Sequence, residues 1–172
     1  LLVVSSGKVL MKYHVSLMEM ITGTPYAEPA FTFNDRPLNE QLRLHADCAK
    51  EADAYRLASA EPSAPVFLVA PEYTYCAHPR NQVGDVTHRF LPNNTKKVVL
   101  KRMASLSGRY PKVAFIFSVA WLKEPDPSNQ FTEGRNTTYV YYGGEKIHSQ
   151  HKNGDAGELL SGDIADGVRY RE

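Results

Sequence analysis

This chain of 172 residues has few cysteines, little net charge and no long apolar run. Its two cysteines, Cys48 and Cys76, are too few for a disulfide framework and are not spaced as a metal-binding pair, which favours a reducing compartment such as the cytoplasm. Twenty Lys and Arg against nineteen Asp and Glu give a net charge of +1, which argues against nucleic acid or an anionic membrane as the main partner. The longest apolar runs, residues 66–70 and 113–117, are far too short to cross a bilayer.

The length of the chain predicts one domain, residues 1–172, with a core of its own. A half-buried strand is expected within residues 9–21, because apolar residues alternate there: Val9, Met11, Tyr13, Val15 and Leu17. A helix is expected over residues 38–60, because apolar residues recur at helical spacing: Leu44, Cys48, Ala52 and Tyr55. Pro62 and Pro65 end this helix, and the apolar run 66–70 then indicates a strand inside a covered sheet. A helix followed at once by a buried strand indicates an α/β fold.

The second half of the chain repeats the order of helix and strand. Thr95 is expected to cap a second helix that ends near Gly108 and Pro111. Its buried stripe is expected to consist of Val99, Met103 and Leu106. A second buried strand, residues 113–121, precedes a hairpin with arms over 137–142 and 146–150 and a turn at Gly143-Gly144. Loops are expected where no period is sustained: residues 22–37, 73–94 and 153–172.

Two charged residues follow predicted strands and are candidates for chemistry. Glu72 comes after the run 66–70 and after Pro71, which fixes the backbone before it, at a place where α/β sheets present side chains to ligands. Lys152 follows the second arm of the hairpin. At one edge of a sheet, the pair would be a general base beside a group that stabilises an oxyanion. The plainer alternatives are a solvated loop carboxylate for Glu72 and an ordinary surface lysine for Lys152.

The order of these elements resembles the nitrilase superfamily of carbon–nitrogen hydrolases. In that family a helix leads into an apolar strand that ends in Pro-Glu, here residues 66–72, and a second helix leads into another apolar strand, here residues 113–121. An Asn-led strand, a Gly turn and a short strand before a lysine follow, here residues 136–142, 143–144 and 146–152. The resemblance covers residues from about 9 to 158, and the ordered succession carries it more than any single motif.

The resemblance implies a nitrilase-like four-layer α-β-β-α sandwich, of which this chain would be the leading part, incomplete at its C-terminus. It implies that Glu72 is the general base, that Lys152 stabilises the tetrahedral intermediate, and that Glu158 is the family's second glutamate. The family's nucleophile is a cysteine one strand beyond the lysine, and this sequence has no cysteine after Cys76. The implied reaction is hydrolysis of a small amide or nitrile, without a metal or cofactor.

A half-sandwich would leave a sheet face and an edge uncovered, so further chain or close association with a partner is expected, with a homo-oligomer as the simplest form. Two other functions stay open. One is a nitrilase-like binding protein that has lost its nucleophile, and the other is an unrelated α/β domain that binds a small ligand at its strand ends. If the chain is such an unrelated domain, Glu72 and Lys152 would lie too far apart to act together.

The cysteines and histidines have roles to be tested as well. Cys48 is expected to be a packed core thiol, and Cys76 is a candidate substitute nucleophile because it follows Glu72 closely. His148 is expected on the face of Lys152 and His151 on the opposite face. A zinc site is not expected, because the remaining histidines that could complete it are loosely placed in a loop: His78 and His88.

Overall fold

The computed structural model describes residues 2–6, 9–18, 38–71, 74–76, 90–123, 132–151 and 168–170. They form a mixed α/β unit, as the sequence predicts. In chain order its elements are β1 (Leu2–Ser6), β2 (Val9–Leu17), α1 (Leu38–Ala58), β3 (Val66–Val69), α2 (Asn93–Arg109), β4 (Val113–Lys123), β5 (Thr132–Tyr142), β6 (Glu145–His151) and β7 (Val168–Tyr170). None of the described helices is long and apolar enough to cross a membrane.

The strands form one hydrogen-bonded sheet in the order β1-β2-β3-β4-β5-β6. Strands β2, β3 and β4 run parallel, whereas β4, β5 and β6 are antiparallel neighbours, so the five central strands make a mixed sheet. Strand β1 pairs antiparallel with β2, and the short β7 pairs with the first residues of β5. The parallel strands are those separated by long connections, whereas the antiparallel hairpins β1–β2 and β5–β6 are each joined by two residues.

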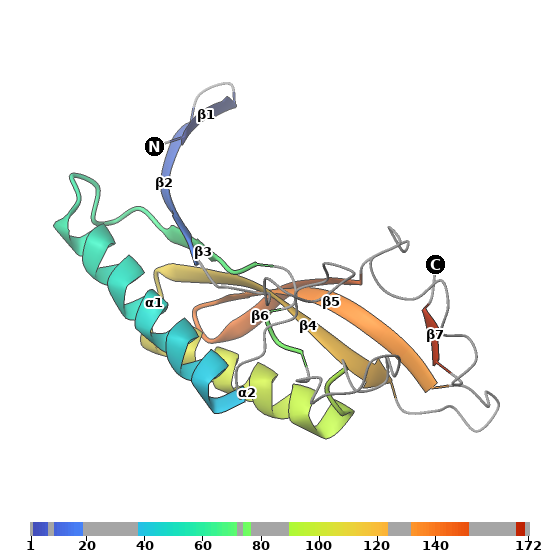
Figure 1. Cartoon of the computed structure of the whole chain (residues 1–172). Helices are drawn as coiled ribbons and strands as arrows, with labels where there is room; N and C mark the ends of the chain where they lie inside the picture. The colour runs from blue at the N-terminus through green and yellow to red at the C-terminus, as the bar shows by residue number, and fades with distance from the viewer. Residues whose placement is uncertain are drawn as a thin grey trace, which may run out of the picture.

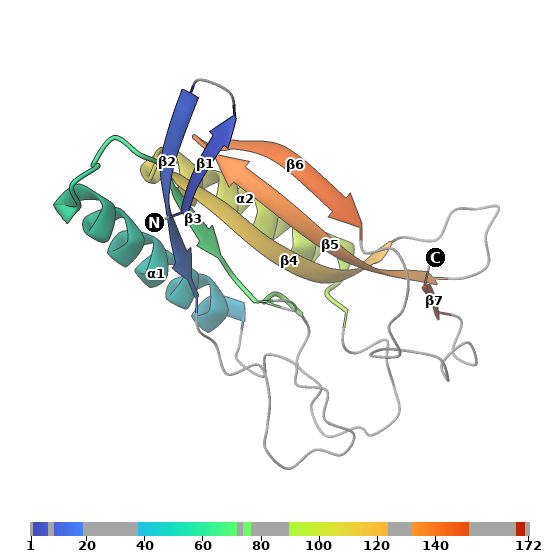
Figure 2. The same ribbon diagram turned by 90° about the horizontal axis from the view of Figure 1, so that it is seen from above.

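Both helices lie on the same face of the sheet (Figure 1). Helix α1 contacts β3 and β4, and helix α2 contacts β4, β5 and β6. Seen from above, the two helices lie behind the strands (Figure 2). The described residues therefore build two layers, one of helices and one sheet, and the second sheet of a four-layer sandwich is not among them.

The core lies between the helices and the sheet. Strands β3 and β4 contribute fully buried side chains, and α2 contributes the stripe that the sequence predicts: Val99, Met103 and Leu106. Around Phe117 the rings of Tyr75, Tyr139 and Tyr141 pack with centroids 5.7 to 5.8 Å away. Burial of such rings supplies much of the hydrophobic stabilisation of a domain this small.

The predicted buried stripe of α1 is right at Ala52 but is otherwise shifted by about one residue. The residues that face the core are Gln41, His45, Ala49, Ala52 and Arg56. Tyr55 is instead exposed, and Cys48 is only partly buried. Successive residues of a helix are rotated by about 100°, so a shift of one residue moves side chains from the core-facing side to the margin of the helix. The cause is that polar residues and alanines occupy the inner stripe, while larger apolar residues lie at its margin.

The alternation in β2 predicts the strand correctly, but its apolar side is not the covered side. His14 faces the helices and is buried, whereas Val15 is 55% and Leu17 is 72% exposed. With Phe67 and Val69 of β3 these residues form an apolar surface on the side away from the helices, which we call the open face. A groove of about 480 Å³ on the open face is lined by Lys12, Tyr13, Val15, Pro65, Phe67 and Val69.

The hairpin is confirmed. Gly143 and Gly144 have φ of 60° and 92°, the positive values that a tight two-residue turn of this kind requires. Strand β5 begins five residues earlier than predicted, at Thr132.

Two other predictions need correction. Thr95 does not cap the second helix, because α2 begins at Asn93 with Pro92 at the N-cap position and no side-chain cap. Residues 153–172 are not all loop, since β7 lies among them. Residues 22–37 and most of 73–94 lie outside the described residues.

Candidate functional site

Glu72, Lys152 and Glu158 all lie outside the described residues, so the structure does not test whether they meet. The segments that flank two of them are described. Residues 70 and 71 precede Glu72, Thr74 and Tyr75 follow it closely, and His151 immediately precedes Lys152. The geometry of these flanking segments defines the candidate site.

One row of residues crosses the sheet next to both positions. Tyr75 bridges to Val119 of β4, Val119 pairs with Thr137 of β5, and Thr137 pairs with His151 of β6. Glu72 precedes the first member of this row by three residues, and Lys152 follows the last member directly. The ends of β3 and β6 thus lie at the same end of the sheet, with β4 and β5 between them.

The chain around Glu72 is fixed to β4 on both sides. The Ala70 N–H donates to Ile116 O at 2.8 Å, and the Tyr75 N–H donates to Ser118 O at 3.2 Å. Between the pair Val69–Ile116 and the bridge Tyr75–Val119, the chain that contains Glu72 has five residues, whereas β4 has two. The connection is therefore three residues longer than the strand beside it and cannot continue the regular ladder.

Tyr75 is held in the core by a polar contact. Its hydroxyl lies 2.9 Å from Nδ1 of His45, and the two rings stack with an interplanar angle of 2°. Both side chains are fully buried. Burial lowers the pKa of His45 to about 4 and raises the pKa of Tyr75, so the pair is neutral near pH 7. His45 Nε2 has no hydrogen-bond partner among the described residues.

A second set of contacts fixes the residue before Lys152. His151 Nδ1 lies 2.8 Å from the Thr137 hydroxyl, which also accepts a hydrogen bond of 2.9 Å from Trp121 Nε1. Arg135 Nη1 lies 3.1 Å from His151 Nε2. Because a guanidinium only donates, Nε2 accepts and the ring proton of neutral His151 is on Nδ1. The end of β6 is thereby tied to β5 through its side chain as well as its backbone.

Neither cysteine has the setting of a nucleophile. The pKa of Cys48 is raised, first by burial and then by the nearby carboxylates of Glu51 and Asp47, which disfavours the reactive thiolate. Cys76 is 2% exposed. It directly follows Tyr75, so its place near the Glu72 segment is as the sequence suggests, but a buried thiol is closed to substrate. Cys48 packs against the core at its margin, in keeping with the expected structural role.

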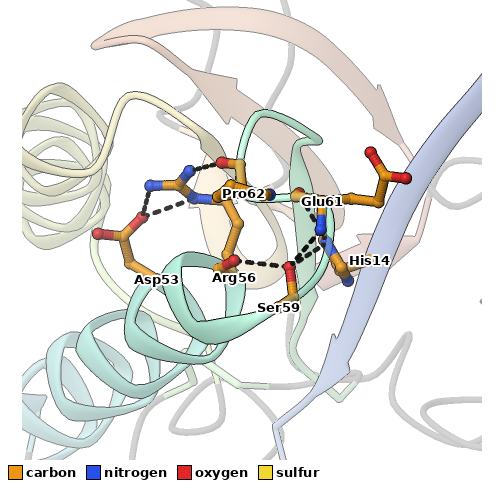
Figure 3. A network of polar contacts seen from close by, with 6 residues as sticks. All are labelled: His14, Asp53, Arg56, Ser59, Glu61 and Pro62. Carbon is orange, nitrogen blue, oxygen red and sulfur yellow. Dashed lines mark hydrogen bonds and ion pairs between the residues drawn. The ribbon is translucent and has the colours of Figure 1, made fainter.

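A further network of polar contacts lies at the C-terminal end of α1 (Figure 3). The Arg56 guanidinium donates to Asp53 Oδ1 from Nε at 2.9 Å and from Nη2 at 2.7 Å, and also to the Pro62 carbonyl. His14 Nε2 lies 3.2 Å from Ser59 Oγ and 3.3 Å from Glu61 O.

A histidine beside a serine hydroxyl can form a catalytic dyad, but the proton positions exclude this role for His14 and Ser59. A carbonyl only accepts, so the contact with Glu61 O requires the proton on His14 Nε2. The Ser59 hydroxyl donates its own proton to Arg56 O at 2.7 Å and accepts from the Glu61 N–H at 3.2 Å. His14 is thus a donor rather than a base. The network satisfies the backbone where α1 ends and joins it to β2.

Within the parts of the chain that are described, no group of three or more His, Cys, Asp or Glu side chains could hold a metal ion. His148 pairs with Val140 and His151 with Thr137, so these two histidines point to opposite faces of the sheet, as alternation predicts.

Comparisons of the chain with protein-family models, with curated proteins and with solved structures found no match.

Sequence reasoning missed the buried polar residues that fix these segments. His45 and Arg56 lie on the inner stripe of α1, and His14 on the covered side of β2. A signal was present in α1, where Gln41, His45, Ala49 and Ala52 follow helical spacing. It was outweighed by the larger apolar residues beside it. No such signal marks His14, because the alternating residues of β2 are apolar on the other side.

Proposed function

We propose that this chain is the leading part of a nitrilase-like hydrolase that acts on a carbon–nitrogen bond of a small amide or nitrile. Glu72 is the general base, Lys152 stabilises the oxyanion and Glu158 assists from the following segment. The nucleophile is a cysteine outside these 172 residues. The observation that carries the proposal is the row Tyr75–Val119–Thr137–His151, which brings the neighbours of Glu72 and Lys152 to one end of one sheet.

In the proposed reaction with an amide, Glu72 accepts the proton of the cysteine thiol and the thiolate attacks the carbonyl carbon. The negative charge that develops on the carbonyl oxygen is stabilised by the Lys152 ammonium. Glu72 then gives its proton to the departing amine, and a thioester remains. Glu72 next deprotonates a water that attacks the thioester, which releases the acid and restores the thiol.

The rigidity of the flanking segments supports these roles. A general base works only within hydrogen-bond reach of the proton that it takes. The two hydrogen bonds to β4 on either side of Glu72, and the side-chain contacts of His151 before Lys152, limit the positions of these flanking residues. Loose loops at these positions would give no such limit.

The finer architecture that we propose is the four-layer sandwich, with a second sheet packed on the open face. Support comes from the apolar side chains there, since Val15 and Leu17 are largely exposed while Tyr13 and Phe67 form an edge-to-face pair with centroids 5.3 Å apart. An apolar sheet face left in water is unfavourable, and a second sheet would bury it at the usual spacing of about 10 Å.

Cross-linking tests the geometry directly. Glu72→Cys and Lys152→Cys are combined in a background of Cys48→Ser and Cys76→Ala, with the fold checked by circular dichroism. We expect a short bifunctional thiol reagent to join the two introduced cysteines. The control pair is Glu72→Cys with Glu145→Cys, because Glu145 is exposed at the opposite end of β6. Equal cross-linking of both pairs, or none of either, would refute a joint role for Glu72 and Lys152.

The chemistry is tested on the protein from its natural source. A mass above 19.3 kDa, with a cysteine in the additional sequence, is the expected result. In that protein Glu72→Gln should abolish hydrolysis of simple amides without loss of folding. Unchanged hydrolysis would remove Glu72 from the mechanism.

The nucleophile-free binding protein is the second candidate. It is favoured by the settings of the two cysteines present, one with a raised pKa and one buried. A natural mass of 19.3 kDa would select this alternative.

A further inference from the structure

Helix α2 is strongly basic, although the chain as a whole is nearly neutral. The helix contains five Lys and Arg residues and no Asp or Glu, although the net charge of all 172 residues is only +1. Helix α1, in contrast, carries three Lys and Arg and four Asp and Glu. This part of the surface can therefore attract an anionic partner, although the chain as a whole is nearly neutral.

A groove of about 350 Å³ lies between the two helices on the side away from the sheet. Its apolar part consists of Leu42, Ala46 and Leu106. Its polar part includes three exposed guanidinium groups, from Arg43, Arg102 and Arg109. Among the residues that the structure describes, no carboxylate lines it.

The arginines of α2 are available for a ligand. Arg43 forms a loose contact with Asp47 at 3.6 Å, and both side chains are exposed. Among the residues that the structure describes, Arg102 and Arg109 have no ion pair or hydrogen bond. Arginine is the residue best suited to planar recognition of carboxylates, because its fork of N–H donors matches two oxygens at once.

We propose that this groove binds an acidic amphipathic segment of a protein partner. The segment would place apolar side chains on Leu42 and Ala46, which are partly exposed, and its carboxylates against the three arginines. This is the mode in which a helix lies in a groove, with anchors at helical spacing and charges at the rim. The inference does not depend on the proposed hydrolase activity.

The groove favours a peptide over the other anionic partners. An anionic membrane would need a row of exposed apolar side chains on α2, whereas Val98 is the one large hydrophobic residue that this helix exposes. A single-stranded nucleic acid would need exposed aromatic rings for stacking, and the lining of the groove has none. An apolar floor with an arginine rim matches a ligand that carries both leucine-like and acidic side chains.

The test uses two variants of the 172-residue chain that lose the same charge. The first, Arg102→Gln with Arg109→Gln, removes the rim of the groove. The second, Lys97→Gln with Lys101→Gln, removes two exposed cations of α2 that do not line it. All four positions are exposed, so both variants should fold, which circular dichroism verifies.

The probe is a phage-displayed library of random peptides about four helical turns long. We expect the wild-type chain to enrich peptides that are rich in Glu and Asp with apolar residues at helical spacing. These peptides should bind the lysine variant almost as well as wild type, and the arginine variant at least about tenfold more weakly. Their affinity should also fall as salt is added.

Three results would overturn the proposal. One is that no enriched peptide depends on the arginines. Another is that both variants weaken binding equally, which would mean unspecific attraction to a basic helix. The third comes from control arms with phosphatidylserine vesicles and with single-stranded RNA: arginine-dependent binding of either, with no arginine-dependent peptide, would assign the groove to a different class of partner.

Discussion

Leu68 of β3 and Leu17 of β2 differ as much as two leucines of one sheet can. Leu68 points toward the helices and is 0% exposed, whereas Leu17 points to the open face and is 72% exposed. Both lie in strands with alternating burial, and their strands are paired neighbours in the sheet. The difference shows that the apolar character of a strand residue does not decide its burial. What decides it is which side of the sheet the helices occupy.

The largest effect is expected at the covered leucine. Leu68→Ala should lower the free energy of unfolding by about 3–4 kcal/mol, because the lost contacts leave a cavity in a close-packed core. Urea unfolding followed by circular dichroism measures the change. A loss below about 1 kcal/mol, the range of most surface substitutions, would mean that the core between helices and sheet is much looser than described.

The buried imidazole on the covered side predicts a dependence on pH. His45 has a pKa near 4 in the folded chain and about 6.5 when unfolded, so the unfolded chain binds more protons between these values. Stability is therefore complete above about pH 6.5 and falls toward pH 4, by up to about 3 kcal/mol from this group.

Urea unfolding of wild type and of His45→Gln across this pH range isolates the contribution of His45. The variant is expected to be less stable at pH 7 but to lose less stability on acidification. Identical pH dependence in the two proteins would show that the imidazole is exposed to water in solution.

A smaller effect is expected from one hydroxyl. Tyr75→Phe keeps the ring and removes the group that contacts His45 Nδ1, so a buried nitrogen is left without its partner. The expected loss is about 1–2 kcal/mol. Tyr141→Phe is the matched control, because Tyr141 also packs on Phe117 and burial alone raises the pKa of its hydroxyl. An equal effect of both substitutions would show that the polar contact adds nothing to packing.

The smallest effect is expected at the exposed leucine. Leu17→Ala should change the stability of the 172-residue chain by less than about 0.5 kcal/mol, because the side chain is already largely in water. In a longer protein in which a second sheet covers the open face, the same substitution should cost several times more. A large loss in the 172-residue chain itself would mean that the open face is covered in solution.

Much of the fold follows from the sequence, and the errors have a common origin. The apolar runs that became β3 and β4, the stripe of α2 and the Gly143-Gly144 turn are local signals that agree with their surroundings. In α1 and β2 the local signal does not tell which side is buried, because each element has apolar residues on more than one side. Choosing between the sides requires knowledge of what packs against them, which local periodicity does not contain.

The candidate site was predictable only in outline. The positions of Glu72 and Lys152 after strands follow from the sequence, and the register of β4, β5 and β6 then brings their neighbours into one row. The contacts that fix these neighbours could not be foreseen. They join Tyr75 to His45 and His151 to Thr137, residues 30 and 14 positions apart in the chain.

The connection between Tyr75 and Leu91 leaves and rejoins the same strand. Tyr75 bridges to Val119 and Leu91 to Trp121, only two residues further along β4, and backbone hydrogen bonds hold both contacts. A segment whose ends are fixed this close together can change in length at little entropic cost, about 0.6 kcal/mol for each doubling. Residues 77–89 could therefore be exchanged for a segment of another length without redesign of the sheet that holds the two ends.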